Sequence, residues 1–228
     1  MLDKQFNKDF KNFTYKAIDL GITSEEISSM LNEVESVKEE WRGNEYRGCA
    51  GLPVFGDLVE EKDRFKGKSG KLDWTPAGKL CPTIQKVYNE KIRPILDQDA
   101  RINILKTYAG NTLHEHVDCQ EKEIGTTQHK LRVVLQGEID KLYFRRSNGS
   151  KWYVPNDYHT YVMDGGHLHA LEESKETKIT MCIGAPWKGA MTPEYEKVLD
   201  NSPYEVKVKY PKIDDEHIDP RFKNDNND

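Results

Sequence analysis

The sequence predicts an α+β protein that is mainly β, in which N-terminal helices buttress a β core. Before about residue 100 the chain shows two helical periodicities, and after it come short β-branched and aromatic runs separated by Gly, Asn, Asp and Pro. Strands at this spacing are typical of a sandwich or barrel, and helices followed by strands favour helices packed on such a core. We therefore expect one domain over residues 1–228, with helical and loop support in 1–99, the β core in 100–187 and a C-terminal extension in 188–228.

The clearest helix is predicted in "ITSEEISSMLNEVESVKEEW", after a short strand in "YKAID". Thr23 and Glu26 form a T-x-x-E capping box, which satisfies backbone N–H groups at the start of a helix. Apolar residues then recur every three or four positions in one stripe: Ile27, Met30, Leu31, Val34 and Val37. A second helix is predicted to begin at Pro82, because proline favours the first turn, and its apolar period continues to about Leu96.

Residues 43–80 are predicted to form a long loop, since they are rich in glycine and charged residues. Loops of this length in a compact domain often serve as lids or binding walls. Arg47, Phe55, Arg64 and Trp74 are therefore candidates for a substrate wall, with ordinary loop packing as the alternative for each.

The second half of the chain is predicted to hold short strands, because its apolar runs are rich in β-branched and aromatic residues. These runs are "RINILKTY", "KLRVVLQG", "KLYFRR", "KWYVP", "HTYVMD" and "TKITMCIGAP". The polar tail "YPKIDDEHIDPRFKNDNND" is expected to fray.

The composition argues against several classes of protein. The 34 basic and 39 acidic residues give a net charge of −5, and no basic stripe is present, so nucleic acid is not an expected partner. The N-terminus lacks a signal-peptide core and no apolar run approaches the roughly 20 residues that cross a bilayer, so we expect a cytoplasmic protein and no membrane partner. The four cysteines form no CxxC pair, which disfavours a zinc knuckle and favours reduced thiols. Nothing in the sequence indicates the oligomeric state.

Two short windows, "LHEHVDCQ" and "DGGHLHALEESKETK", concentrate the histidines. His116 and Asp118 lie at i and i+2, so on an extended chain both side chains point to the same face and could bind one ion. A third ligand must come from a distant segment, and His169 is the natural donor. Two histidines and one carboxylate with open positions form the facial triad of non-haem Fe(II) oxygenases. The alternative is that these are solvated loop histidines.

Cations occupy one face of two predicted strands. In "TKITMCIG", alternation places Lys178, Thr180 and Cys182 opposite the isoleucine face, and in "HKLRVVLQG" it places Lys130 and Arg132 opposite the leucine face. A lysine inside a β core is costly unless it meets an anion, so Lys178 is a candidate to anchor a small dicarboxylate. The alternative is a solvated face.

The chain resembles a known family over residues 100–187. "LKTYAGNTLHEHVD" is similar to the segment of prolyl 4-hydroxylase-like enzymes in which a tyrosine, a glycine turn and H-x-D follow one another. "HKLRVVLQG" and "TYVMDGGHLHAL" resemble strands of the aspartyl/asparaginyl β-hydroxylase-like group. Both belong to the Fe(II)/2-oxoglutarate-dependent dioxygenase superfamily, and the resemblance implies a double-stranded β-helix core of the cupin or jelly-roll type.

The resemblance implies roles for particular residues. His116, Asp118 and His169 would be the catalytic iron ligands, and Lys178 would bind the distal carboxylate of 2-oxoglutarate. Further cosubstrate contacts would come from Tyr108, Thr180 and Arg132. Arg132 is the weakest candidate of the three, and it lies on a strand that also helps to bind carboxylates in the β-hydroxylase-like group.

The sequence departs from the family patterns in places, and two other histidines are alternative candidates for the metal ligands. Asp164 precedes His169 by five positions, as in the β-hydroxylase-like group, but that group has an arginine about ten positions after the histidine. Here Lys178 stands at nine, closer to the prolyl hydroxylases. His114 competes with His116, and His167 with His169, as ligands.

By resemblance, the activity is hydroxylation of an amino-acid residue or amino-acid-like small molecule, with Fe(II), 2-oxoglutarate and O2 consumed and succinate and CO2 formed. The substrate is a small molecule or a peptide that the sequence does not identify. Asp118 argues against a halogenase, because halogenases of this class lack the acid. Two alternatives stay open: a non-catalytic cupin-type ligand-binding module, and a metal-dependent cupin enzyme independent of 2-oxoglutarate.

Overall fold

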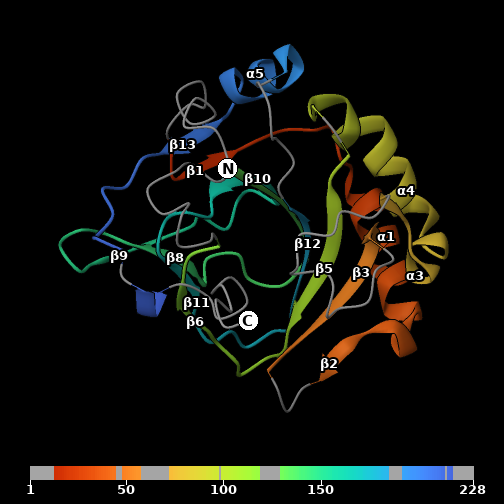
Figure 1. Ribbon diagram of the computed structural model, residues 1–228, viewed down its shortest axis with the longest axis horizontal. Helices are drawn as coiled ribbons and strands as arrows, with labels where there is room; N and C mark the ends of the chain where they lie inside the picture. Colours follow the sequence, from red (N-terminus) through yellow and green to blue (C-terminus); the bar gives the residue numbers. More distant parts are fainter. Residues whose placement is uncertain are drawn as a thin grey trace, which may run out of the picture.

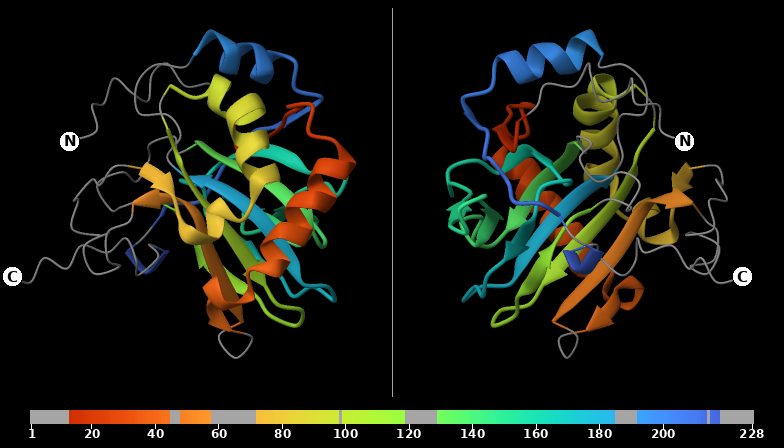
Figure 2. Two further views of the ribbon diagram at one scale, coloured as in Figure 1. Left: turned by 90° about the vertical axis from the view of Figure 1, so that its right-hand side faces the viewer. Right: turned by 60° about the vertical axis from the view of Figure 1, so that its left-hand side comes forward.

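The computed structural model describes residues 13–44, 48–57, 72–97, 99–118, 129–184, 192–213 and 215–217. Two antiparallel β-sheets face each other, and helices cover the outer face of the larger sheet (Figures 1 and 2). The larger sheet has nine strands in the order β13-β1-β10-β7-β12-β5-β3-β2, with β4 paired to β3. The smaller sheet has four strands in the order β6-β11-β8-β9. The protein is therefore mainly β with few helices, as the sequence predicts.

The larger sheet consists of β1 (Tyr15–Ala17), β2 (Arg42–Asn44), β3 (Cys49–Asp57), β4 (Leu72–Trp74), β5 (Arg101–Thr107), β7 (His129–Gln136), β10 (Thr160–Asp164), β12 (Lys178–Gly184) and β13 (Tyr204–Val206). The smaller sheet consists of β6 (Leu113–His116), β8 (Leu142–Arg145), β9 (Lys151–Tyr153) and β11 (His169–Leu171). The α-helices are α1 (Ser24–Ser36), α3 (Pro76–Lys79), α4 (Pro82–Val87) and α5 (Pro193–Asp200). All six strands predicted in the second half of the sequence are present.

Both predicted helices are confirmed. The Thr23 hydroxyl accepts a hydrogen bond from the backbone N–H of Glu26, and the Glu26 carboxylate accepts one from the N–H of Thr23 at 2.9 Å, which completes the capping box. Met30 and Val34 are fully buried against the larger sheet. The second helix begins at Pro82 and continues after α4 through a π-helical turn and a 3₁₀ turn to Ile95.

The prediction of a loop over residues 43–80 is wrong for much of that range. This range contains β3, a nine-residue strand that pairs with β5. Leu52 and Val54 of β3 are fully buried. Glycine and proline concealed this strand, because both weaken a strand pattern in a sequence. The structure accommodates Pro53 at a point where the pairing with β5 shifts register. Residues 45–47 and 58–71, which include Arg47 and Arg64, lie outside the described residues.

The polar tail is ordered further than the sequence suggests. Between α5 and the end of the described chain, β13 pairs with β1 at an edge of the larger sheet. Beyond it, Tyr210 and Ile213 pack with Val117 and Leu168 in a small apolar cluster. The expectation of fraying is therefore wrong for residues 210–213 of that tail, because apolar burial offsets the entropy of ordering them.

The larger sheet separates two cores. Leu131 and Val133 of β7, with Ile179, Met181 and Ile183 of β12, pack on the helix side. Val134, Tyr161 and Met163 pack on the other side, toward the smaller sheet. Strict alternation then places a further set of side chains on the side facing the smaller sheet: Lys130, Arg132, Lys178 and Thr180. We call this side the inner face, and the predicted partition of both strands is confirmed.

Within the described ranges, no helix is both long and apolar enough to span a lipid bilayer.

Gly78 lets α3 lie directly on β3, because a Cβ at that position would come within 1.9 Å of the Val54 carbonyl oxygen. We expect Gly78→Ala to reduce the free energy of unfolding by about 3 kcal/mol, since two backbones would have to separate. Gly184→Ala is the matched control, because a Cβ there meets nothing within 4 Å. Urea denaturation measures both variants. Equal free energies of unfolding for Gly78→Ala and Gly184→Ala would contradict the close packing of α3 on β3.

Candidate metal centre

Cross-strand pairing joins the two histidine windows. His116 ends β6 and His169 begins β11, and the two residues lie directly opposite each other in the antiparallel pair. Their ring centroids are 4.5 Å apart. Asp118 follows β6 and places Oδ1 3.6 Å from His116 Nε2 and Oδ2 3.9 Å from His169 Nε2. The three ligand atoms lie within 4.8 Å of one another, so they could hold a metal ion between them.

The tautomer of both rings is set by the backbone. His116 Nδ1 lies 2.7 Å from the carbonyl oxygen of His114, and His169 Nδ1 lies 2.7 Å from that of His167. A carbonyl oxygen only accepts, so each Nδ1 carries the proton and donates it, which leaves the Nε2 lone pairs free toward Asp118. Metal-binding histidines are oriented in this way by partners outside the ligand set. The donor set, two bare imidazole nitrogens and one carboxylate, therefore fits a non-haem iron of the facial-triad type.

Charge at the site is arranged to keep Asp118 ionised and His169 neutral. Burial would raise the pKa of the Asp118 carboxyl, but the charges of His169, Lys130 and Arg132 hold it well below its usual range. Burial lowers the pKa of His169 to about 3. At neutral pH the cations that act on Asp118 are therefore those of Lys130 and Arg132. A deprotonated carboxylate beside a neutral imidazole is the state that binds a metal ion.

Arg132 contacts the triad itself. Its guanidinium donates to Asp118 Oδ2 at 3.3 Å and to the carbonyl of Leu131 at 3.2 Å. The sequence assigned Arg132 to the cosubstrate, and the structure gives it a definite contact with Asp118. Such a contact orients a ligand carboxylate.

Lys178 lies on the inner face of β12, 6 % exposed, at the position opposite Thr107 of β5. Its ammonium forms no ion pair or hydrogen bond with any residue that the structure describes. Burial, with a smaller contribution from the charge of Arg132, lowers the pKa of Lys178 to about 8, so it is still mainly protonated at neutral pH. Burying a cation without a counter-ion costs free energy, so we expect an anionic ligand to bind beside Lys178.

Thr180 and Tyr108 differ in where they lie. Thr180 is buried on the same face of β12 as Lys178, two residues along. Tyr108 has its ring 5.9 Å from the ammonium of Lys106, which also lies over Trp41 and pairs with Glu35 of α1. The structure thus places Tyr108 near the helix side of the sheet and does not bring it to the triad.

The competing histidines lie outside the cluster. His114 is exposed, with its ring centroid 5.5 Å from that of His116. His167 is buried against Tyr210 at 4.1 Å, and burial lowers its pKa to about 4. Asp164 lies 3.8 Å from His167 Nε2 and accepts a hydrogen bond from the N–H of Gly166, so it shapes the turn that leads into β11.

The two described members of the proposed substrate wall pack elsewhere. Phe55 and Trp74 pack against each other with tilted rings, 4.8 Å between centroids, and both contact Tyr88 in the helix-side core. This packing is the ordinary alternative considered for both residues.

Sequence reasoning missed two contributors to the site. Gly165 lies against Asp118 and Lys130, since a Cβ at Gly165 would be 3.0 Å from atoms of both side chains. The carbonyl of His217 accepts a hydrogen bond from the N–H of Val117 at 2.9 Å, between the two ligands His116 and Asp118. The double glycine at 165–166 was a visible signal of close approach, whereas the contact from the C-terminal segment had no local signal in the sequence.

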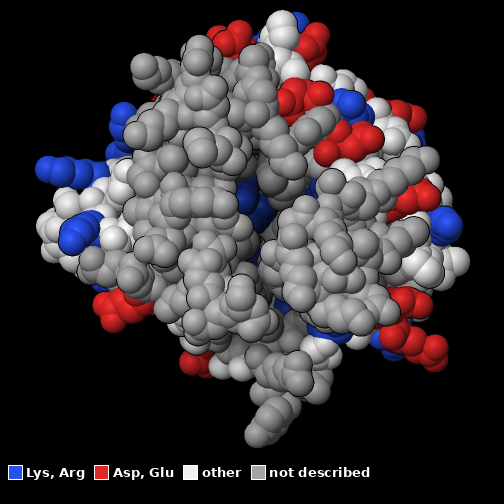
Figure 3. Space-filling view, in the orientation of Figure 1, with Lys and Arg blue, Asp and Glu red and all other residues white. Residues whose placement is uncertain are grey.

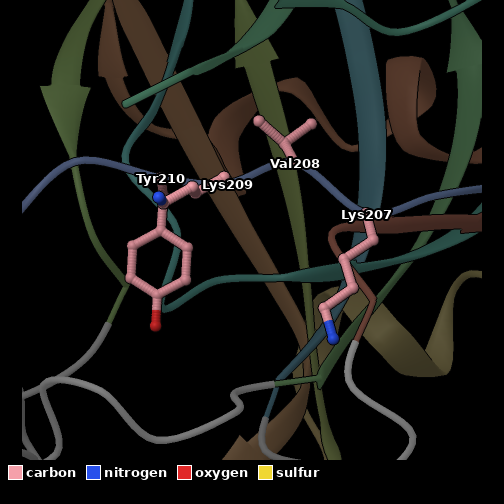
Figure 4. Close-up of a pocket in the computed structure, with 4 residues that line it drawn as sticks. All are labelled: Lys207, Val208, Lys209 and Tyr210. Carbon is pink, nitrogen blue, oxygen red and sulfur yellow. The ribbon is translucent and has the colours of Figure 1, made fainter. Parts of the chain in front are cut away.

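Lys or Arg side chains are visible at the centre of the face shown in a space-filling view (Figure 3). A cavity of about 480 Å³ is lined by Lys207, Val208, Lys209 and Tyr210, which follow β13. Lys207 and Tyr210 extend their polar ends to the same side, away from Val208 (Figure 4). Because Tyr210 also packs on His167, this cavity borders the segment that carries His169.

No protein-family model matches the sequence, and no curated protein is significantly similar to it. Solved structures do match. A prolyl hydroxylase from Trichoplax adhaerens, in complex with a hypoxia-inducible factor oxygen degradation domain peptide fragment, is 9% identical, with a TM-score of 0.51 over 81% of this chain and 86% of its own. The chain therefore has the fold of that prolyl hydroxylase. This fold and the His-Asp-His cluster agree with the superfamily predicted from sequence motifs.

Two further structures are similar at lower scores. HygX from Streptomyces hygroscopicus, with nickel and 2-oxoglutarate bound, is 11% identical, with a TM-score of 0.48 over 81% of this chain and 87% of its own. A Pseudomonas putida prolyl-4-hydroxylase is 10% identical, with a TM-score of 0.47 over 79% of this chain and 96% of its own.

The clustered residues predict a single high-affinity site for a divalent cation. We expect His116→Ala, Asp118→Ala and His169→Ala each to weaken binding of Mn(II) or Co(II) by at least about 100-fold, because each removes one of three ligands. His114→Ala is the matched control and retains wild-type affinity, since its ring is exposed and outside the cluster. Isothermal calorimetry measures the affinities. A His114 variant as impaired as the other three would contradict the assignment.

Proposed function

We propose that the chain is a single-domain Fe(II)- and 2-oxoglutarate-dependent oxygenase with a double-stranded β-helix core, and that it hydroxylates an amino-acid residue or an amino-acid-like small molecule. The observation that carries this proposal is Lys178, which is buried and has no ion-pair or hydrogen-bond partner among the described residues. It lies on the same inner face as Arg132, which contacts the His116–Asp118–His169 cluster through Asp118. A metal-binding cluster together with a separate buried cation suits a cosubstrate that has one end on the metal and a carboxylate at the other end.

Each residue has a distinct task in this proposal. His116, Asp118 and His169 hold the iron on one side, which leaves positions open for the cosubstrate and O2. Bound iron with 2-oxoglutarate supplies the oxidising chemistry, in which succinate and CO2 are formed and one oxygen atom is inserted into a C–H bond. Lys178 pairs with the distal carboxylate of 2-oxoglutarate, and Thr180 is positioned to donate to that carboxylate from the same face. Arg132 keeps Asp118 ionised and oriented.

Lys178 also separates this function from the two alternatives. A ligand-binding cupin, or a metal cupin that does not use 2-oxoglutarate, has no need for a buried lysine without a counter-ion on its inner face. Burying that charge without a partner costs free energy, and a chain under no functional constraint would gain by replacing it. The buried position of Lys178 therefore favours the oxygenase.

Anaerobic reconstitution with Fe(II), followed by exposure to O2 and 2-oxoglutarate, tests the function. We expect slow succinate formation without added substrate, which rises when a substrate from an amino-acid and peptide panel is present. In Lys178→Met this succinate formation is lost together with 2-oxoglutarate affinity, while metal affinity stays, because Lys178 does not touch the metal ligands. Metal loss in that variant, or wild-type protein that neither binds nor consumes 2-oxoglutarate, would refute the proposal.

The cost of Lys178 predicts a trade-off between stability and function. The difference between its ordinary pKa of 10.5 and about 8 in the fold corresponds to about 3 kcal/mol of unfavourable free energy at neutral pH. We expect metal-free Lys178→Met to be more stable than wild type by about 1 to 3 kcal/mol at pH 7 in urea denaturation. Lys79→Met, at an exposed lysine, stays within about 0.5 kcal/mol of wild type.

The same pKa difference sets the direction of the pH dependence. Between pH 8 and 10.5 the unfolded chain binds more protons than the folded chain at Lys178, so wild-type stability rises with pH across this window. The advantage of Lys178→Met should therefore shrink from pH 7 to pH 10. A variant that is less stable than wild type at pH 7 would show that Lys178 already has a stabilising partner in the absence of cosubstrate.

A further inference from the structure

Lys130 is the third cation of the inner face, and the proposed mechanism gives it no ligand. It lies on β7 opposite Met163 of β10, two residues before Arg132, and is half-buried. Its side chain runs beside Asp118 over Gly165. A Cβ placed on Gly165 would lie 3.0 Å from Lys130 Cε and 3.0 Å from Asp118 Cβ. Lys130 Cε and Asp118 Cβ are therefore at most 6.0 Å apart. Lys130 therefore borders the metal cluster directly.

The three inner-face cations differ in their partners. Arg132 contacts Asp118 at 3.3 Å. Lys178 has the distal carboxylate of 2-oxoglutarate as its partner in the proposed function. Lys130 makes no ion pair or hydrogen bond within the described part of the chain, although its charge acts on Asp118. Among the described residues it is therefore the cation near the metal cluster that has no anion in the proposed cosubstrate complex.

The charges of the described residues around the metal cluster, counted with Fe(II) and 2-oxoglutarate, point the same way. Fe(II) and the 2-oxoglutarate dianion cancel each other, and Arg132 offsets Asp118, which leaves the positive charges of Lys130 and Lys178. The acidic group that acts on Lys178 is Asp140, which itself lies 3.8 Å from Lys141. A buried site with excess positive charge binds an anionic ligand more readily than a neutral one, because little water is there to screen the charge.

We propose that Lys130 binds a carboxylate of the substrate, so that the substrate is a small carboxylic acid such as a free amino acid, and not a neutral residue inside a peptide. The ammonium would donate a charge-assisted hydrogen bond that holds the acid beside the metal. This inference rests on the proposed function and deepens it. It also makes Gly165 a specificity element, since any side chain there would displace Lys130 or Asp118.

The test uses the full chain loaded with Mn(II) and 2-oxoglutarate, which forms the cosubstrate complex without turnover. The probes are the common amino acids, each offered as the free acid and as its carboxamide, together with the side-chain pairs aspartate/asparagine and glutamate/glutamine. Ligand-observed NMR measures their affinities. We expect wild type to prefer at least one acid to its amide by on the order of 10-fold or more, as a charge-assisted hydrogen bond gives.

Three variants assign that preference to Lys130. In Lys130→Met the preferred acid binds on the order of 10- to 100-fold more weakly and the preference over the amide disappears, while Lys130→Arg restores much of both. Lys106→Met is the matched control, because Lys106 belongs to the opposite, helix-side face of the larger sheet and pairs with Glu35. We expect Lys106→Met to retain the wild-type preference for the acid over its amide. Affinities for Mn(II) and 2-oxoglutarate are measured in all three variants.

The outcomes separate this inference from the function on which it rests. If wild type binds 2-oxoglutarate but no acid in preference to its amide, the inference fails and the proposed function stands. If Lys130→Met loses 2-oxoglutarate affinity as severely as Lys178→Met does, Lys130 serves the cosubstrate and the inference again fails. If wild type binds no 2-oxoglutarate at all, the proposed function itself fails.

Discussion

The antiparallel pairing of β6 with β11 is the constraint on which the candidate site depends. It places His116 directly opposite His169, although 53 positions separate them in the chain (169 minus 116), and Asp118 then closes the cluster from the end of β6. The same two segments are held from outside by the apolar contacts of Ile213 and by the His217 carbonyl. A metal-binding cluster thus follows from strand register, and the side chains need little adjustment of their own.

The second constraint is the cost of charge on the inner face. The larger sheet has one side devoted to apolar packing against helices, and the sequence of β7 and β12 alternates accordingly. On the opposite side, Lys130, Arg132 and Lys178 occupy positions where a stable core would have apolar residues. Asp118 offsets the charge of Arg132, whereas neither lysine has an ion-pair partner among the residues that the structure describes. In our proposal, anionic ligands offset the cost of burying these two charges.

Features encoded locally could be predicted from the sequence, and features set by tertiary contacts could not. The Thr23 cap, the helical stripe and the alternation of β12 are local patterns, and all are present. The strand β3 was missed because Gly51 and Pro53 mask a strand whose register only β5 defines. The role of Tyr108 at the cosubstrate was implied by the family resemblance alone, and the structure places its ring beside Lys106. For the site, the choice of His116 and His169 over their neighbours agrees with the cluster in the structure, while the contacts of Gly165 and His217 depend on distant segments.

In the proposed enzyme, one metal and one 2-oxoglutarate bridge the His-Asp-His cluster and Lys178. The decisive measurement is a crystal structure of the anaerobic complex with Fe(II) and 2-oxoglutarate. We expect a metal within about 2.0–2.3 Å of His116 Nε2, His169 Nε2 and an Asp118 oxygen. We also expect the distal carboxylate about 2.7–3.2 Å from Lys178 Nζ. A metal held by other residues, or a distal carboxylate bound away from Lys178, would contradict it.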